Sequence, residues 1–302
     1  MNESKKILPN LIIAGVNKAG TTSLFAYLAK HPDFCGSAIK ETCYFLPERY
    51  NEQIEPIENY HKQFESFNGQ KIIMEATPGY FYGGENLIGA IQREISNVKI
   101  IVVLREPVSR MVSFYKFMKS RLLLDKNSDF ESYFKKCESF SKNDFKDKTL
   151  NPYFGLMGGH YIDFIDDWKF FYPSNFMLID FDKFKKSPLL ILEEIAEWLE
   201  IDSTPFKSFT FEIENKTKSF GNKSFHGVAL KINHSFEKLF RKSPGVKKRL
   251  SSLYFKINGK TAEEKIDKLA LEKLKEYYEP SNQKLKNYLI KHNFKNIPEW
   301  LN

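Results

Sequence analysis

The segment that most constrains the fold is LIIAGVNKAGTTSLFAYLAKH, Leu11–His31. An apolar run stops at Gly15, a second glycine follows at Gly20, and Leu24 and Leu28 then recur at helical spacing. A strand, a glycine-containing turn and a helix in this order present backbone N–H groups and the positive end of a helix dipole to a phosphate. The segment therefore predicts a phosphate-binding loop, although an ordinary strand–turn–helix corner would show the same local pattern.

The lysine of this loop does not stand where a nucleoside triphosphatase needs it. There, lysine directly follows the second glycine and reaches the β and γ phosphates. Here that place is taken by Thr21, and the lysine is Lys18, inside the loop. A charge over the loop suits a bridging oxygen next to a single 5′-phosphate. The predicted nucleotide contacts of this loop are Lys18, Ala19, Gly20, Thr21, Thr22 and Ser23.

Further apolar runs alternate with helical patterns along the chain. This alternation predicts an α/β fold with three layers, P-loop-like, in which a central parallel sheet is flanked by helices. Ligands of such sheets gather at the carboxyl ends of the strands. The predicted strands are Leu11–Gly15, Lys71–Met74, Lys99–Leu104 and Phe176–Asp180, and the predicted helices include Thr21–Lys30, Glu85–Ile95 and Leu189–Leu199.

Length and composition bound the class of protein. The 302 residues, 42% of them hydrophobic, predict a single domain over 1–302, with 125–150 and 207–260 as insertions or segments that cover the acceptor and the nucleotide. The net charge of +8 fits an anionic ligand and does not by itself indicate nucleic acid. Three cysteines without a CxxC motif argue against zinc and disulfides. No run reaches the ~18 apolar residues of a membrane span, so we expect a cytoplasmic protein without an integral membrane segment.

A second phosphate site is predicted at the end of another strand. The stretch VVLREPVSRMVSFY places Arg105 at the strand terminus, where a magnesium site would instead want an aspartate. If a helix begins after Pro107, Arg110 and Ser113 lie on one of its faces, three residues apart. An arginine and a serine hydroxyl that converge would hold a phosphate.

These two stretches together resemble the two nucleotide-binding elements of the sulfotransferase family. GVNKAGTTSL resembles that family's glycine loop with an internal lysine, and Arg105–Tyr115 matches its R-x-P-x-x-R-x-x-S-x-Y element. The resemblance implies 3′-phosphoadenosine-5′-phosphosulfate (PAPS) as donor, adenosine 3′,5′-bisphosphate (PAP) as product, and no metal. It also implies that Lys18 neutralises the leaving phosphate, while Arg105 and Ser113 hold the 3′-phosphate.

Further segments are similar to the heparan-sulfate-type, carbohydrate branch, in a bacterial member. KETCYF resembles the branch's K-E-x-H-F-F segment, with Cys43 and Tyr44 as departures, and this implies that Lys40 and Glu41 contact the acceptor. KTKSFGNKS resembles the loop that closes over the nucleotide. Through that loop, the resemblance adds Lys218 and Lys223 to the nucleotide contacts.

MEATPGYF resembles the branch's E-K-T-P-x-Y-F segment, in which the glutamate is the catalytic base. Glu75 matches that glutamate, and Ala76 replaces the usual lysine. From chemistry alone, a carboxylate at a strand end can take a proton from an attacking hydroxyl or amine, and a buried anion nearby would raise its pKa. The alternatives are that Glu75 caps a turn or pairs with Lys40 or Lys18. His160, in GGHY, is the second candidate base and could line the acceptor site.

The function expected from the residues and the resemblance is direct, in-line transfer of a sulfonate group from PAPS to a hydroxyl or amino group. The expected acceptor is a carbohydrate, with a small metabolite as the other possibility. Two alternatives stay open at this point. A P-loop nucleotide kinase would need magnesium and ATP. A non-catalytic binder of an acidic glycan would have no need of Glu75.

Overall fold

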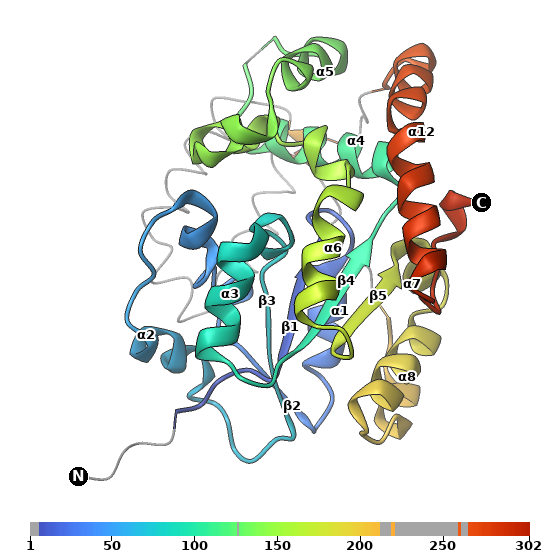
Figure 1. The fold of residues 1–302 in the computed structure, drawn as a ribbon. Helices are drawn as coiled ribbons and strands as arrows, with labels where there is room; N and C mark the ends of the chain where they lie inside the picture. Colours follow the sequence, from blue (N-terminus) through green and yellow to red (C-terminus); the bar gives the residue numbers. More distant parts are fainter. Residues whose placement is uncertain (1–5, 126, 212–218, 221–258, 261–264) are drawn as a thin grey trace.

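The computed structural model describes residues 6–125, 127–211, 219–220, 259–260 and 265–302. Its centre is a five-stranded sheet in the order β2-β3-β1-β4-β5 (Figure 1). Every neighbouring pair in this sheet is parallel. The predicted α/β fold with a central parallel sheet is therefore confirmed. The strands are β1 (Leu11–Gly15), β2 (Phe34–Gly36), β3 (Ile72–Ala76), β4 (Lys99–Leu104) and β5 (Phe176–Asp180).

Helices lie on both faces of the sheet: α3 and α6 cover the face toward the viewer in Figure 1, and α1 lies behind it. Crossover helices are what parallel pairing requires, because each strand must return to the same end of the sheet. The helices are α1 (Thr21–Leu28), α2 (Ile57–His61), α3 (Gly84–Glu94), α4 (Pro107–Ser120), α5 (Phe130–Glu138), α6 (Ile162–Phe171), α7 (Phe181–Lys186), α8 (Pro188–Leu199) and α12 (Lys268–Lys291). A short antiparallel pair joins β6 (Ser219–Phe220) to β7 (Gly259–Lys260).

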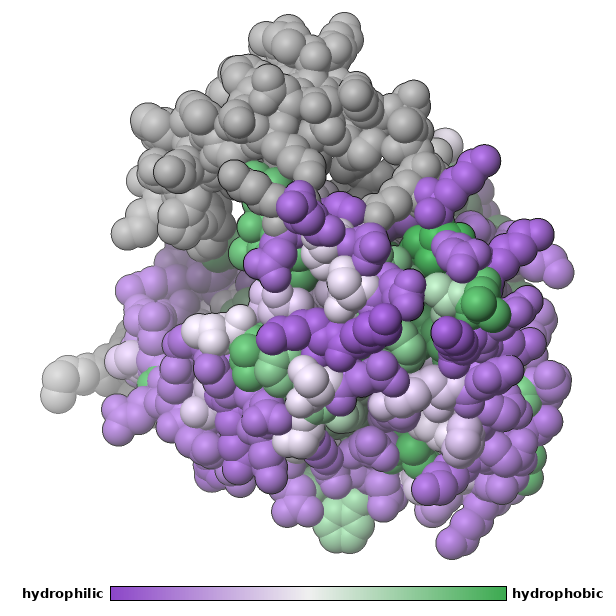
Figure 2. Space-filling view, turned by 90° about the horizontal axis from the view of Figure 1, so that it is seen from above, coloured by the Kyte–Doolittle hydropathy of each residue, from purple (hydrophilic) through white to green (hydrophobic). Residues whose placement is uncertain are grey.

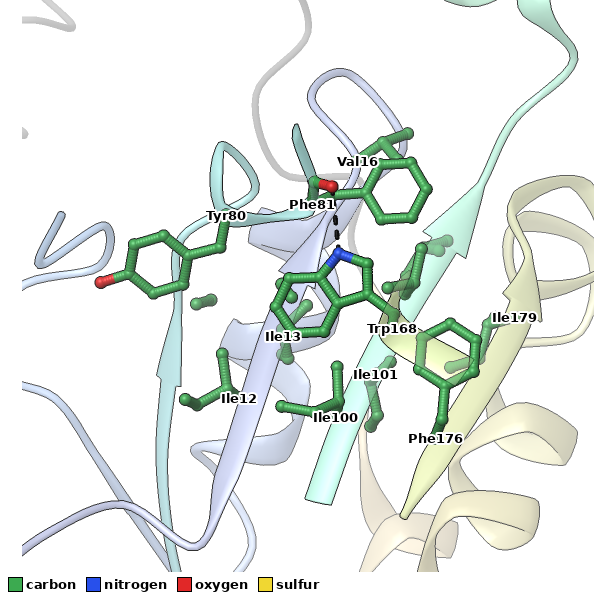
Figure 3. Packing of buried hydrophobic residues seen from close by; sticks show 14 of the residues in the cluster. Ile12, Ile13, Val16, Tyr80, Phe81, Ile100, Ile101, Trp168, Phe176 and Ile179 are labelled. Atoms are coloured by element: carbon green, nitrogen blue, oxygen red, sulfur yellow. Dashed lines mark hydrogen bonds between the residues drawn. The ribbon is translucent and has the colours of Figure 1, made fainter. Parts of the chain in front are cut away.

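The core follows from the uninterrupted apolar character of the central strands. Every residue of β1 is buried, as parallel strands covered on both faces require. Isoleucines of β1 and β4 pair side by side, with Ile12 opposite Ile100 and Ile13 opposite Ile101 (Figure 3). Trp168 of α6 packs over them and donates its indole N–H to the carbonyl of Phe81 at 3.0 Å. This bond ties α6 to the segment that follows β3.

The structure departs from the sequence prediction in three places. Strand β3 ends at Ala76 rather than Met74, so Glu75 lies within the strand. Strand β2 was missed, because three residues are too short to show a period. The segment 125–150 is not merely a surface insertion. Its helix α5 buries Phe130, Tyr133 and Cys137 in a second hydrophobic cluster with α4 and α12. Most of 207–260 lies outside the described residues, and the single-domain assignment stays a prediction.

Candidate active site

The predicted phosphate loop lies between β1 and α1, at the carboxyl edge of the sheet. Gly20 has a φ of 77° and is the N-cap of α1. A Cβ at this position would approach the Phe181 ring to 2.8 Å, so both the backbone conformation and the space require glycine. No side chain caps this helix, and its first turn carries no acid. Its first N–H groups are therefore free to bind an anion.

Lys18 lies over the loop with its ammonium group 4.2 Å from the centre of the Phe117 ring. Arg105 donates a hydrogen bond from Nη1 to the carbonyl oxygen of Lys18 at 2.9 Å. Burial and then the charge of Arg105 lower the pKa of Lys18 to about 8. Neither Lys18 nor Arg105 forms an ion pair with a carboxylate in the described part of the chain. Two neighbouring cations without such a partner favour binding of an anionic ligand.

The other loop residues offer a ligand mainly their backbone N–H groups rather than their side chains. The side chains of Ala19, Thr21 and Ser23 are buried, whereas that of Thr22 is partly exposed. The burial reflects the packing of α1 against the sheet. The loop therefore offers a ligand its N–H groups, the Thr22 hydroxyl and the Lys18 ammonium.

Arg105 follows β4 and connects the two predicted phosphate elements. Its guanidinium stacks 4.7 Å from the Phe181 ring, and Tyr161 donates to its carbonyl oxygen at 2.6 Å. Burial lowers its pKa. Ser113 is half-buried in α4, the helix that begins at Pro107 as predicted.

The prediction that Arg110 and Ser113 converge on one phosphate is wrong. Arg110 is fully buried and donates from Nη2 to the carbonyl of Gly155, while its Nε and Nη1 have no hydrogen-bond partner among the described residues. The reason is that this face of α4 packs against the Leu156–Gly159 segment and α12 rather than facing the loop. Of the two arginines in this motif, Arg105 is thus the one available to a nucleotide.

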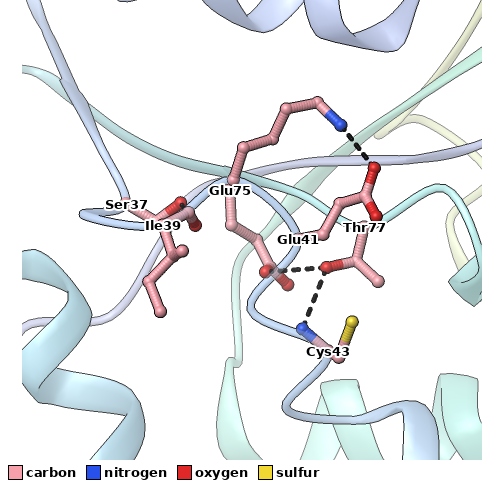
Figure 4. A network of polar contacts seen from close by, with 7 residues as sticks. Ser37, Ile39, Glu41, Cys43, Glu75 and Thr77 are labelled. Atoms are coloured by element: carbon pink, nitrogen blue, oxygen red, sulfur yellow. Dashed lines mark hydrogen bonds and ion pairs between the residues drawn. The ribbon is translucent and has the colours of Figure 1, made fainter. Parts of the chain in front are cut away.

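Glu75 is completely buried at the end of β3. Its Oε2 accepts hydrogen bonds from the hydroxyls of Thr42 and of Thr77, the latter at 3.3 Å. Thr77 in turn accepts from the backbone N–H of Cys43 at 3.2 Å (Figure 4). Burial raises the pKa of Glu75 to about 6, against the hydrogen bonds from neighbouring hydroxyls, which lower it. A buried carboxyl with this pKa suits a general base at neutral pH.

Lys40 and Glu41 lie beside this carboxyl but pair with each other, at 2.7 Å. The alternative in which Glu75 pairs with Lys40 is therefore wrong. The backbone N–H of Glu41 donates to the carbonyl of Ala76 at 3.0 Å, so the segment lies against the end of β3. The charges of Lys40 and Glu41 both act on the pKa of Lys18. The segment thus lies against the end of β3 and close enough to Lys18 for its charges to act there.

His160 packs against the C-terminal helix. Its ring centre lies 5.3 Å from that of Tyr277 and 5.2 Å from that of Tyr278, both on α12, and burial lowers its pKa. These contacts are those of a packed side chain, and a role in acceptor binding stays a prediction. Lys218 and Lys223 lie outside the described residues.

Sequence reasoning missed several residues that surround the predicted base and lysine. Tyr60 and Tyr80 are buried near the carboxyl, and both affect the pKa of Glu75. In the part of the chain that the structure describes, neither the Tyr60 hydroxyl nor Glu75 Oε1 has a hydrogen-bond partner. Phe117 supports Lys18. Tyr80 could have been noticed in ATPGYF, but no local pattern marks Tyr60.

A hollow of about 170 Å³ is lined by Arg49 of η1 (Leu46–Tyr50) and Tyr82 of η3 (Tyr80–Tyr82). Along the chain, η1 follows the segment of Lys40 and Glu41, and η3 follows β3. The Arg49 guanidinium stacks on the Phe154 ring at 4.5 Å, without an ion pair to a carboxylate in the described part of the chain. The hollow therefore combines aromatic faces with a cation. Its other lining residues include Lys142, Phe145, Lys146, Phe164 and Asp167.

Two further features of the described residues bear on the class of site. They contain no group of three histidine, cysteine or carboxylate side chains placed to hold a metal ion. Their helices include none with the length and apolar character needed to cross a bilayer. The face seen from above in Figure 2 is mostly hydrophilic where it is described, with small separate hydrophobic areas.

A parallel sheet with an uncapped, glycine-entered helix at its carboxyl edge is the arrangement of a P-loop-like fold. The family model described as "Sulfotransferase domain" matches residues 8–287. The chain therefore belongs to the sulfotransferase family.

Individual relatives agree with this assignment. The chain is 28% identical over 219 residues to the bifunctional heparan sulfate N-deacetylase/N-sulfotransferase 1 of Caenorhabditis briggsae, an alignment that takes in 69% of this chain but only 24% of that protein. It is 24% identical over 279 residues to the human heparan sulfate glucosamine 3-O-sulfotransferase 5, covering 92% of this chain and 71% of that protein. The crystal structure of a sulfotransferase from Alicyclobacillus acidocaldarius has a TM-score of 0.68 at 17% identity, covering 98% of this chain and 100% of that one, and so shares the fold.

Proposed function

We propose that the protein moves a sulfonate group from PAPS to a hydroxyl or amino group of a carbohydrate acceptor by direct in-line transfer. The observation that carries this proposal is the arrangement of Glu75, a buried carboxyl with a pKa of about 6, at the strand end next to the loop of Lys18. A base for the acceptor and a cation for the leaving group are thereby supplied from neighbouring strands, β3 and β1.

The residues of the loop fit an anionic nucleotide. The N-terminus of α1 is uncapped, Gly20 leaves no room for a side chain, and Lys18 and Arg105 form no ion pair with a carboxylate among the described residues. When bound, PAPS would supply an activated sulfonate group. Lys18, the loop N–H groups and Thr22 would stabilise the charge that grows on the bridging oxygen. Arg105 and Ser113 would hold the 3′-phosphate and orient the donor.

Arg105→Ala is expected to weaken binding of PAP by about 10–100-fold, since a hydrogen bond between charged groups contributes about 1.5–3 kcal/mol. Calorimetric titration with PAP in EDTA measures this directly. Wild-type binding without metal and weaker binding by the variant would support the donor site. Binding of ATP with magnesium, and none of PAP, would contradict the proposed function.

The hollow lined by Arg49 and aromatic rings supports a carbohydrate acceptor with an acidic group. Aromatic faces with a few placed polar groups are typical of small-ligand sites, and an arginine without a carboxylate partner can pair with a carboxylate or sulfate of the ligand. At about 170 Å³ the hollow holds a single such group or sugar unit rather than a large ligand. The names of the relatives, which specify heparan sulfate, agree with an acidic glycan.

Arg49→Gln is expected to raise the KM for chemically desulfated heparan sulfate by about 10-fold, because one charged contact is lost. The KM for PAPS should not change. Arg93→Gln is the matched control, since Arg93 is largely exposed on α3 and its ion pair, with Glu48, is long at 3.7 Å. Equal effects of the two substitutions would rule out a specific acceptor contact at Arg49.

A further inference from the structure

The predicted base is closed off from any acceptor by its own neighbours. Glu75 is 0% exposed, and of the four hydroxyl groups that act on its pKa, those of Tyr80, Tyr60 and Thr77 belong to residues that are 0%, 1% and 2% exposed. The fourth, Thr42, is partly exposed. Among these four residues, Thr42 is therefore the one that reaches the surface of the protein.

We propose that Thr42 is a further catalytic residue, which receives the proton of the acceptor and passes its own proton to Glu75. This inference rests on the proposed sulfonate transfer. Thr42 donates its hydroxyl hydrogen to Glu75 Oε2, the direction that a relay needs. The other contacts of Thr42 Oγ1, with the N–H of Tyr44 and the hydroxyl of Tyr80, are both 3.4 Å and therefore weak. A hydroxyl oxygen has two lone pairs, so it can still accept a hydrogen bond from an incoming hydroxyl.

The segment of Thr42 also lies near Lys18, the residue proposed to stabilise the leaving group. Glu41, which precedes it, is close enough to Lys18 for its charge to raise the pKa of that ammonium group. Glu41 has a φ of 67° and Cys43 a φ of 56°, so the backbone turns sharply on both sides of Thr42. The N–H groups of Glu41 and Cys43 bond to Ala76 and Thr77 respectively. These bonds hold Thr42 against the end of β3.

The step balances without any further reactant. The acceptor oxygen forms a bond to sulfur as its proton moves to Thr42 Oγ1, and the proton of Thr42 moves to Glu75 Oε2. The bond between sulfur and the bridging oxygen breaks, and its electron pair leaves with PAP, next to Lys18. Glu75 returns the proton to solvent after the products leave.

The test compares Thr42→Val, which keeps the shape without the hydroxyl, with Thr42→Ser, which keeps the hydroxyl without the methyl group. The readout is release of PAP from PAPS, with desulfated heparan sulfate as acceptor, or with water if the glycan is not used. The relay predicts a loss of about 10²-fold in kcat for Thr42→Val at unchanged KM for PAPS, and near wild-type kcat for Thr42→Ser. If Thr42 only packs against Glu75, the order is reversed, and this overturns the relay.

Two further readouts separate a relay from a structural role. The first readout is a plot of the wild-type rate against the fraction of D₂O in the solvent. If two protons move in the transition state, this plot is curved, and if one proton moves, it is a straight line. Loss of the Thr42 hydrogen bond should also move the acidic limb of the pH profile above pH 6, because that bond lowers the pKa of Glu75. If wild-type protein binds PAP but Thr42→Val retains full kcat, the relay alone is wrong. If wild-type protein neither binds PAP nor releases it from PAPS, the proposed function itself fails.

Discussion

Glu75→Gln is expected to lower kcat by about 10²–10⁴-fold, the usual contribution of a positioned general base. Glutamine has nearly the same shape and can still accept from Thr42 and Thr77, but it cannot take a proton. Binding of PAP should be unchanged, since no hydrogen bond links Glu75 to the loop. The measurement is PAP release under single-turnover conditions, with calorimetric titration of PAP as the control. If Glu75→Gln retains the wild-type kcat, Glu75 is not the general base, and His160 is the next candidate.

The pH dependence gives the same substitution a second test. Activity should rise with pH through about 6, because Glu75 must be ionised to act as base.

The raised pKa of Glu75 also lowers the stability of the folded protein at neutral pH. The pKa rises from its ordinary 4.5 to about 6 in the folded protein, so the folded state binds the proton more tightly than the unfolded chain. Below about pH 4.5 the carboxyl is neutral in both states, and above about pH 6 the destabilisation is complete, at about 2 kcal/mol.

Glu75→Gln should therefore have a higher free energy of unfolding than wild type at pH 8, and a similar one at pH 4. Denaturant unfolding at the two pH values measures this difference. A variant that is inactive and also less stable at pH 8 would show that Glu75 is held for structure rather than for proton transfer.

Lys18→Met is expected to lower kcat/KM by about 10²–10³-fold, the range for loss of one group that stabilises charge in the transition state. Methionine keeps the length of the side chain and its packing on Phe117, so the loss reports the charge. Lys30→Met is the matched control, because Lys30 is exposed just after α1 and lies over the Tyr27 ring, away from the loop. A similar loss in both variants would contradict a specific role for Lys18.

The pKa of Lys18 makes a further prediction for the wild-type protein. At about 8 in the free protein, the ammonium group loses its charge as pH rises through that value. At low donor concentration kcat/KM should therefore fall above about pH 8, which gives a bell-shaped profile with its acidic limb near pH 6. At saturating donor the alkaline limb should move upward, because a bound anion favours the charged lysine.

Much of the fold was predictable because it depends on local patterns. The strands Leu11–Gly15, Lys99–Leu104 and Phe176–Asp180 were found at their observed bounds, since a short, uninterrupted apolar run is typical of a strand buried on both faces. The loop of Lys18 was equally visible, because Gly20 is needed for the backbone conformation and Gly15 for space against Phe81. The three residues of β2 and the packing of α5 were missed, since neither shows a period long enough to read.

The sequence by itself determined the class of fold, the phosphate loop and the identity of the candidate base. The tertiary structure alone decided which arginine is available at the nucleotide site and how Glu75 is enclosed. Arg105 and Arg110 are both part of one motif, yet α4 buries Arg110 against the Leu156–Gly159 segment and leaves Arg105 beside Lys18. Thr42 and Tyr60 reach Glu75 from segments distant in the chain. The pKa of a carboxyl depends on burial, and burial exists only once those segments have packed together.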